Sequence, residues 1–183
     1  MLRFLESLFQ LEIEEKRLVL IRGSVLDVEI PPFTKCVANI PYYISSDLLQ
    51  LFILSKRLDA TYTLLVQKEF AEKLMVSKKH DSTFLSTFVQ SYFHIEYQFN
   101  VSRYCFSPPP SVESAVITMK PNPSVSPACI ANPQKYQSFL RACFRSKNQS
   151  LRKNLKRWNE SVQTDLSCRP WELSSEEYMK LFS

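Results

Sequence analysis

The pattern of apolar and polar positions changes several times along the chain between helical and extended spacing. Apolar residues at positions 2, 4, 5, 8, 9 and 11 predict an amphipathic helix over residues 2–11. Short apolar or β-branched runs predict strands over residues 16–21, 36–38, 60–66, 95–101 and 115–119. Further helices are predicted over residues 45–56, where Ser45 or Ser46 can act as the cap, and over residues 69–76 and 82–92.

This order of elements predicts the fold class. Strands alternate with helices up to residue 76, and two strands with a hairpin-like relation follow, which indicates an α/β sheet with an antiparallel edge. Prolines at 121, 123, 127 and 133, without apolar periodicity, predict a linker over residues 121–133. Helices are predicted beyond it over residues 136–158 and 174–182, the last with a capping start at Ser174 and Glu177. We therefore expect a sheet domain over residues 1–120, the linker, and a small helical domain over residues 134–183.

The positive charge is concentrated in the predicted helical domain. The formal net charge is +5, and no acidic residue lies between Glu113 and Glu160. The same interval holds Lys120, Lys135, Arg141, Arg145, Lys147, Arg152, Lys153, Lys156 and Arg157. This basic segment is either a solvated helix face or a surface for the phosphate backbone of a nucleic acid.

Composition excludes several kinds of site. Gly23 is the only glycine among 183 residues, which excludes a glycine-rich nucleotide loop from this chain. The five cysteines are odd in number and lack CxxC spacing, so we expect reduced, mostly buried thiols and neither a zinc site nor disulfides. No apolar run reaches the roughly 18 residues of a membrane span, and charges interrupt the apolar amino-terminal run. We expect an intracellular, cytoplasmic protein.

The turn Asn39-Ile40-Pro41-Tyr42 follows directly after the predicted strand over residues 36–38. Ligands of open α/β sheets bind at the carboxyl ends of strands, where this turn would lie. Asn39 offers an amide, Pro41 fixes the backbone, and Tyr42 supplies a flat ring. A nucleobase with an exocyclic amino group would find acceptors and a stacking face there. The four residues alone are equally consistent with a plain strand-to-helix turn.

A second loop, residues 105–114, sets Phe106 beside the proline run Pro108-Pro109-Pro110 between two predicted strands. Three prolines reduce the entropy lost when such a loop is ordered, so Phe106 can be a preformed stacking platform. Phe106 can equally be a core residue beneath a proline-rich turn.

Together the two motifs resemble one known family, the rRNA adenine N6-dimethyltransferases. Asn39-Ile40-Pro41-Tyr42 is similar to the N-[IL]-P-[YF] motif of adenine-N6 methyltransferases, and residues 106–116 are similar to the F-x-P-x-P-x-V-x-S-A-V segment of the family. Residues 139–155 look like the basic tail pattern of the small-subunit branch, and residues 169–174 like its R-P-E-x-L-S, with Trp171 inserted. The large-subunit, Erm-type branch usually lacks these tail signatures, so the resemblance favours the small-subunit branch.

The resemblance implies a Rossmann-like methyltransferase sheet and the N6-dimethylation of adenosines in small-subunit rRNA by S-adenosylmethionine. By the same resemblance Asn39, Pro41, Tyr42 and Phe106 would be the catalytic residues. Asn39 and the Pro41 carbonyl would accept hydrogen bonds from the amino group, and the two rings would sandwich the flipped adenine. The expected partners are rRNA and the small ribosomal subunit, with no membrane and no metal, and the expected state is a monomer. The expected RNA-binding residues are Arg141, Arg145, Lys147, Arg152, Lys153, Lys156 and Arg157.

The cofactor half of the family pattern departs from this sequence. The glycine-rich loop of the family and the acidic residue that holds the ribose are absent, and Gly23-Ser24-Val25-Leu26 stands where the family usually has Gly-Asp. Ser24, Val25 and Asn39 are the remaining candidates for cofactor contact. We therefore expect an amino-terminally truncated enzyme whose sheet is incomplete. The alternative is a non-catalytic RNA-binding module for ribosome assembly.

Overall fold

The computed structural model describes residues 2–76, 81–156, 158 and 166–183. Its contacts divide the chain into two compact units, Met1–Pro31 and Pro32–Ser183. The first unit holds helices α1 (Leu2–Leu8) and α2 (Gln10–Glu14). The predicted helix over residues 2–11 is confirmed in this region, but it is broken at Phe9.

The predicted strand over residues 16–21 is wrong, because the described structure has no strand there. The backbone amides of Arg17 and Leu18 both donate to the Glu12 carbonyl, at 2.8 and 3.0 Å, and Lys16 has a φ of 57°. These bonds close the end of α2 and turn the chain, so the amides at the start of the apolar run serve a helix end rather than a strand. Apolar residues alone do not make a strand without a paired neighbour.

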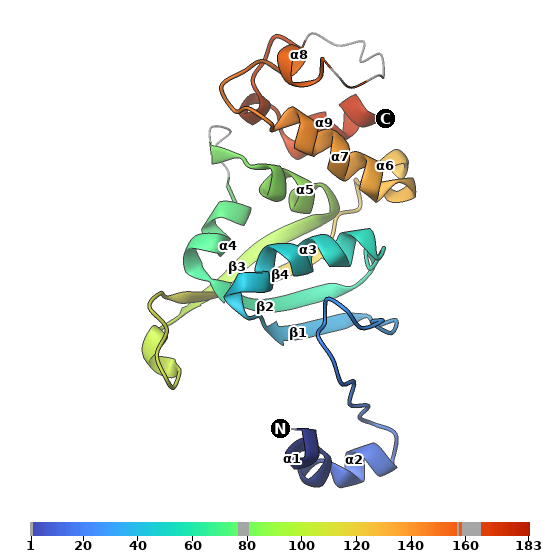
Figure 1. Ribbon diagram of the computed structural model, residues 1–183, viewed down its shortest axis with the longest axis vertical. Coiled ribbons are helices and arrows are strands. Elements are labelled where there is room, and N and C mark those ends of the chain that lie inside the picture. The colour runs from blue at the N-terminus through green and yellow to red at the C-terminus, as the bar shows by residue number, and fades with distance from the viewer. Residues whose placement is uncertain (1, 77–80, 157, 159–165) are drawn as a thin grey trace. The chain divides into compact units, whose positions relative to one another are not determined.

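The second unit is built on a four-stranded mixed sheet (Figure 1). Its strands are β1 (Lys35–Asn39), β2 (Thr61–Gln67), β3 (Phe93–Val101) and β4 (Ser114–Pro121), in the order β1-β2-β4-β3. β1 and β2 are parallel, and β4 pairs antiparallel with both β2 and β3. The predicted α/β sheet with an antiparallel edge is confirmed, as are the predicted strands of this unit.

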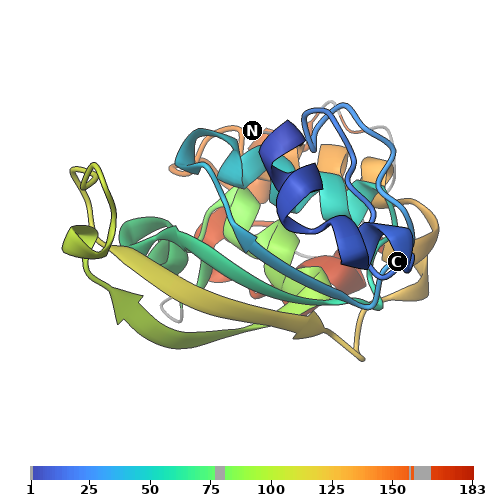
Figure 2. The ribbon, with the colours of Figure 1, turned by 90° about the horizontal axis from the view of Figure 1, so that it is seen from below.

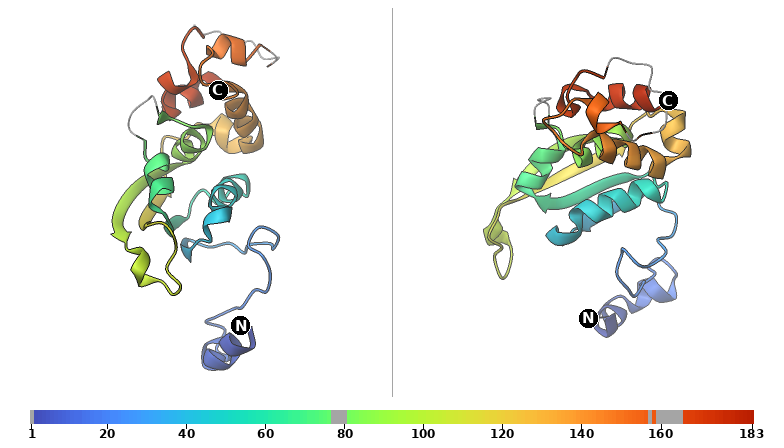
Figure 3. Two further views of the ribbon diagram at one scale, coloured as in Figure 1. Left: turned by 60° about the vertical axis from the view of Figure 1, so that its left-hand side comes forward. Right: turned by 45° about the horizontal axis from the view of Figure 1, so that its top comes forward.

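Helices cover one face of the sheet in two layers (Figures 1 and 3). α3 (Ser45–Leu54), α4 (Lys68–Leu74) and α5 (Phe84–Tyr92) form the nearer layer. β2 follows an alternating burial pattern, with Tyr62, Leu64 and Val66 fully buried, as expected for a strand with one face toward helices. The helices predicted over residues 45–56, 69–76 and 82–92 are confirmed. The predicted cap of α3 is wrong, because Ile44 is the capping position and makes no side-chain bond.

The farther layer comes from the carboxyl-terminal part of the chain, and aromatic side chains join it to the nearer layer. Its helices are α6 (Pro127–Ala131), α7 (Pro133–Cys143), α8 (Leu151–Asn154) and α9 (Ser175–Phe182). Tyr136 of α7 lies 6.1 Å from the ring of Phe88 in α5 and 5.0 Å from that of Phe182 in α9. The Tyr136 hydroxyl is also within 2.8 Å of the Ser91 hydroxyl, so the two layers share one buried core.

Two predicted features of this part look different in the structure. Residues 121–133, predicted to be a linker, contain α6, and Cys129 within it is fully buried. The single helix predicted over residues 136–158 is wrong, since α7 ends at Cys143 and α8 begins at Leu151. The Asn154 amide donates to the carbonyls of Cys143 and Ser146 at 2.8 and 2.9 Å, and so stabilises the turn between them. The capping start of α9 is confirmed by reciprocal bonds between Ser174 and Glu177.

Candidate functional site

The candidate base-binding turn lies where β1 ends. Asn39 is the last residue of β1, and the chain leaves the sheet through Ile40, whose amide donates to the Leu65 carbonyl of β2 at 3.2 Å. Ile40 is buried, whereas Asn39 and Pro41 are exposed. Buried Ile40 thus fixes the turn to the sheet, and the residues on either side of it are exposed.

The polar groups of this turn can accept hydrogen bonds. In the described part of the chain the Asn39 side chain has no hydrogen-bond partner. The Pro41 carbonyl accepts the Ile44 amide at 3.0 Å. A carbonyl oxygen has two lone pairs, so one acceptor position at Pro41 is left for a ligand.

Tyr42 connects this turn to the second motif. Its hydroxyl lies 2.6 Å from the hydroxyl of Ser114, the first residue of β4. Ser114 is fully buried, and its backbone lies opposite Gln67 of β2 and Val101 of β3. The ring of Tyr42 is therefore anchored to the end of the sheet where the loop from residue 102 to residue 113 begins and ends.

That loop extends beyond the ends of the other strands (Figures 1 and 2). It holds the short 3-10 helix η3 (Arg103–Cys105), and Phe106 follows it, half-buried. The Glu113 carboxylate accepts the Arg103 amide at 3.0 Å, and the Glu113 carbonyl accepts the Lys68 amide at 3.0 Å. The two ends of the loop are thus tied to each other and to the start of α4. The loop that holds Phe106 therefore begins and ends at the end of the sheet that Tyr42 contacts.

The sequence patterns missed Ser114 as the partner of Tyr42. Seventy-two positions separate the two residues, and no spacing rule relates them. Ser114 lies within the quoted S-A-V segment, so the resemblance marked the residue but not its contact.

The candidate RNA-binding cations lie in the carboxyl-terminal part. Those that the structure describes are all exposed: Arg141, Arg145, Lys147, Arg152, Lys153 and Lys156. Arg157 lies outside the described residues. Arg141 also makes contacts within the chain, because its guanidinium donates to the Gln50 side-chain oxygen at 2.7 Å and lies 4.4 Å from the centre of the Phe84 ring. The charged groups of the other described cations in this set are exposed to solvent.

The candidate cofactor residues Ser24, Val25 and Asn39 stay predictions. Ser24 and Val25 belong to the first unit and Asn39 to the second. The Ser24 hydroxyl already accepts the Leu26 amide at 3.3 Å in a local turn. A Cβ atom at Gly23 would lie 2.3 Å from the Val28 side chain, so the only glycine is used for a close local approach.

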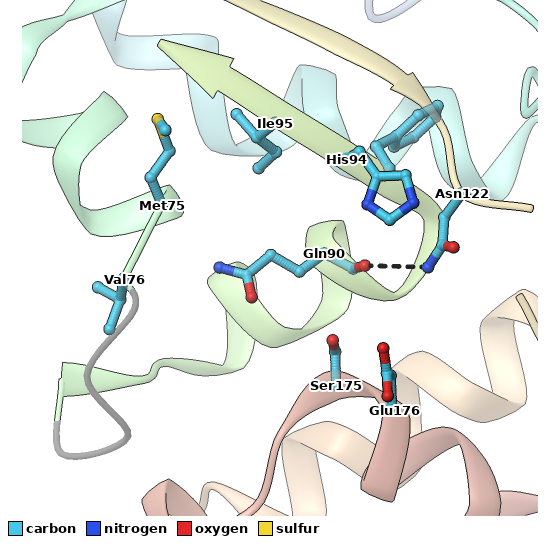
Figure 4. A pocket seen from close by; sticks show the side chains of 9 residues that line it. Met75, Val76, Gln90, His94, Ile95, Asn122, Ser175 and Glu176 are labelled. Atoms are coloured by element: carbon cyan, nitrogen blue, oxygen red, sulfur yellow. Dashed lines mark hydrogen bonds between the residues drawn. The ribbon is translucent and has the colours of Figure 1, made fainter. Parts of the chain in front are cut away.

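A pocket of about 240 Å³ lies elsewhere, between the α4–α5 region and the start of α9 (Figure 4). His94, Gln90, Asn122 and Glu176 line it. Asn122 is buried, but its amide already donates to the Ser91 carbonyl at 3.1 Å and its oxygen accepts the Ser124 amide at 2.9 Å. The Asn122 side chain thus serves the fold, and none of the predicted site residues lines the pocket.

The cysteines show no sign of reactive chemistry. All five are thiols, and only Cys129 and Cys143 are buried, so the expectation that most are buried is wrong. Burial raises the pKa of Cys129 to about 12 and also raises that of Cys143.

In the part of the chain that the structure describes, no cluster of side chains could hold a metal ion. The helices described there are all too short or too polar to cross a membrane.

The order of strands, the helical layers and the turn at the end of β1 define a Rossmann-like methyltransferase fold. A solved dimethyladenosine transferase from Plasmodium falciparum shares this fold with a TM-score of 0.80 and 24% identity, and the match covers 99% of this chain and 78% of that one. The family model described as ribosomal RNA adenine dimethylase matches residues 2–176. The chain belongs to the ribosomal RNA adenine dimethylase family.

Curated relatives are similar over most of this chain. Ribosomal RNA small subunit methyltransferase A of Persephonella marina is 34% identical over 174 residues, which are 92% of this chain and 65% of that protein. The probable dimethyladenosine transferase of Caenorhabditis elegans is 39% identical over 131 residues, or 70% of this chain and 41% of that protein. The chain thus spans less than two thirds of the length of these relatives.

Proposed function

We propose that this protein acts in the N6-dimethylation of adenosines in small-subunit rRNA during ribosome biogenesis in the cytoplasm. The observation that carries the proposal is the 2.6 Å contact between the Tyr42 and Ser114 hydroxyls. It joins the base-binding turn at the end of β1 to the strand that follows the Phe106 loop. Two motifs that are far apart in the sequence thereby form one end of the sheet. S-adenosylmethionine is the methyl donor that membership of the family implies.

The chain's own residues would act by holding the base. Asn39 and the remaining lone pair of the Pro41 carbonyl would accept hydrogen bonds from the adenine amino group and orient its nitrogen. The rings of Tyr42 and Phe106 would stack on the faces of the base. Asn39 is exposed, so a proton released from the amino group can pass to solvent without a general base. Catalysis by these residues is then chiefly positioning and electrostatic.

Asn39→Ala tests this assignment. We expect methyl transfer to fall about 100-fold or more, because one oriented acceptor of the reacting amino group is lost. The assay uses a form of the protein that carries the family's glycine-rich segment and measures labelled methyl transfer to small-subunit rRNA. Large-subunit rRNA is the parallel substrate that separates the Erm-type alternative. Asn132→Ala, at another exposed asparagine, is the matched control and should leave the rate unchanged. Equal rates for both variants would contradict the pocket.

A second candidate function is RNA binding without catalysis, in ribosome assembly. The observation that favours it is that Gly23 is the only glycine of this sequence, so a glycine-rich cofactor loop is absent from it. The two candidates differ in one result. A form of the protein that carries the family's glycine-rich segment transfers methyl groups if the first is correct, and binds rRNA without transfer if the second is correct.

Both candidates predict that the basic segment contacts phosphates. Replacing Arg152 and Lys153 together by alanine should weaken rRNA binding and reduce the slope of log K against log salt by about 1.8, since each phosphate contact contributes about 0.9. Lys180→Ala, which removes a cation of α9 outside this segment, is the control. An unchanged slope in the double variant would show that these two cations do not face the RNA.

A further inference from the structure

Tyr104 is an exposed aromatic side chain in the loop between β3 and β4. It lies in η3 and is 74% exposed, although it is one of the large hydrophobic residues of the chain. Hydrogen bonds of Glu113 hold both ends of the loop, so the exposed Tyr104 side chain lies on an ordered segment. Binding residues are concentrated on loops that a rigid scaffold positions, so this ring is a candidate contact for a ligand.

The ring is also held in position. The Arg103 guanidinium donates to the Tyr104 hydroxyl at 2.9 Å and lies 5.0 Å from the centre of its ring. The Ser102 hydroxyl accepts the Tyr104 amide at 3.3 Å, and the Glu113 carboxylate accepts the Arg103 amide at 3.0 Å. Little side-chain entropy would therefore be lost when a ligand stacks on Tyr104.

The position of Tyr104 relates it to the candidate base pocket. Tyr104 precedes Phe106 by two residues, so their Cα atoms are at most about 7 Å apart. The Phe106 amide donates to the Arg103 carbonyl at 3.3 Å, which keeps these residues in one turn. Phe106 is half-buried, whereas Tyr104 is exposed. A strand with one base against Phe106 would bring a neighbouring base to Tyr104.

We propose that Arg103 and Tyr104 form a stacking platform for an unpaired RNA base beside the target adenine. This inference rests on the proposed function. Base stacking on an aromatic ring tolerates any base, and the Arg103 charge favours a phosphate nearby. Glu96, the acidic side chain of β3, is neutralised by Lys120 at 2.8 Å, and the Glu113 carboxylate is engaged by the loop amide. A paired base in a duplex stays in its stack and cannot use the platform.

Equilibrium binding to the whole 183-residue chain tests the platform without any cofactor. The probes are a fluorescently labelled, unpaired oligoadenylate RNA and a duplex RNA of the same length. Tyr104→Ala should weaken binding of the unpaired RNA about 5- to 150-fold and leave duplex binding unchanged. Tyr104→Phe keeps the ring and should retain wild-type affinity within about twofold. Phe99→Ala, at an exposed aromatic residue of β3, is the matched control and should also retain it.

Three results would overturn the platform. The first is that Tyr104→Ala binds the unpaired RNA with wild-type affinity. The second is that Tyr104→Ala loses as much affinity for the duplex as for the unpaired RNA. The third is that Phe99→Ala loses as much affinity for the unpaired RNA as Tyr104→Ala does. The last would indicate a general apolar surface for a protein partner. A wild-type chain that binds no unpaired RNA would overturn it as well. Methyl transfer is measured separately, so loss of the platform and failure of the proposed catalysis give different results.

Discussion

Two adjacent tyrosines of the turn after β1 have different surroundings. The Tyr42 hydroxyl contacts buried Ser114, whereas Tyr43 is 87% exposed. Both belong to the 3-10 helix η1 (Tyr42–Ile44). Successive side chains of a 3-10 helix point about 120° apart, because three residues complete a turn. The short helix therefore turns one ring toward β4 and the other to solvent.

Ser114→Ala should loosen the Tyr42 ring. The variant leaves the part-buried Tyr42 hydroxyl without its partner, so we expect the free energy of unfolding to fall by about 1 kcal/mol and methyl transfer to slow. Tyr42→Phe removes the other hydroxyl, and the double variant should be no worse than the more damaging single one, because the two residues share one bond. Urea unfolding and initial rates measure both effects. Tyr43→Phe, which removes an exposed hydroxyl, is the control, and additive losses in the double variant would contradict the shared bond.

At this scale the sequence could predict part of the site. The residue types at 39–42 and the ring at 106 indicated base chemistry only through their resemblance to one family, and that chemistry stays a prediction. The contact between Tyr42 and Ser114 depends on the pairing of Gln67 with Ser114 across β2 and β4. Strand register is a property of the folded sheet that the pattern within either strand does not contain.

At the scale of elements, predictions were correct where the cap and the apolar spacing of an element lie within its own segment of sequence. α5 begins at a capping box between Thr83 and Ser86, and its apolar spacing faces the core. The prediction over residues 136–158 failed because a buried side chain, Asn154, binds carbonyls eight and eleven residues earlier. Apolar periodicity cannot report such a tertiary bond.

The helical layers are also joined by a polar contact. Gln50 of α3 accepts hydrogen bonds from Gln137 at 2.9 Å and from Arg141 at 2.7 Å, both of α7. Arg141 in addition lies over the Phe84 ring of α5. The carboxyl-terminal layer is thus attached to the helix that follows the candidate base-binding turn. Arg141 as an RNA contact stays a prediction beside this role within the chain.

Arg141→Ala should destabilise the second unit by about 1–3 kcal/mol, because one charge-assisted hydrogen bond and one cation–π contact are lost. Urea unfolding followed by circular dichroism measures the change. Arg145→Ala removes the same charge from an exposed position just after α7 and should stay within about 0.5 kcal/mol of wild type. Equal destabilisation by both variants would indicate that total charge, rather than the contact with Gln50, sets the effect.

At the scale of the whole second unit, the core is rich in buried groups that lose a proton only at high pH. Tyr62, Tyr92, Tyr136 and Tyr178 are fully or almost fully buried, and so are Cys129 and Cys143. Burial raises the pKa of each tyrosine above its ordinary value of 10.0 and that of each of these thiols above 9.0. Their hydroxyls are bonded inside the fold; for example, that of Tyr92 donates to the Cys129 carbonyl at 2.9 Å. The folded unit therefore keeps protons that the unfolded chain releases.

Because the folded unit keeps protons that the unfolded chain releases, its free energy of unfolding should fall as the pH rises. Below pH 9 both states are protonated at these groups and stability is complete. As the pH rises from 9 toward 12, the Cys129 thiol ionises in the unfolded chain first, because its pKa in the fold is raised to about 12. The free energy of unfolding should then fall by up to about 1.4 kcal/mol per pH unit for each such group, with the tyrosines adding to the loss above pH 10.

Urea unfolding at a series of pH values measures how the free energy of unfolding depends on pH. Cys129→Ala should make this dependence shallower, and Cys105→Ala, at an exposed thiol, should not. If the free energy of unfolding did not change across this pH range, these groups would release their protons equally in the folded and unfolded states, which would contradict the prediction.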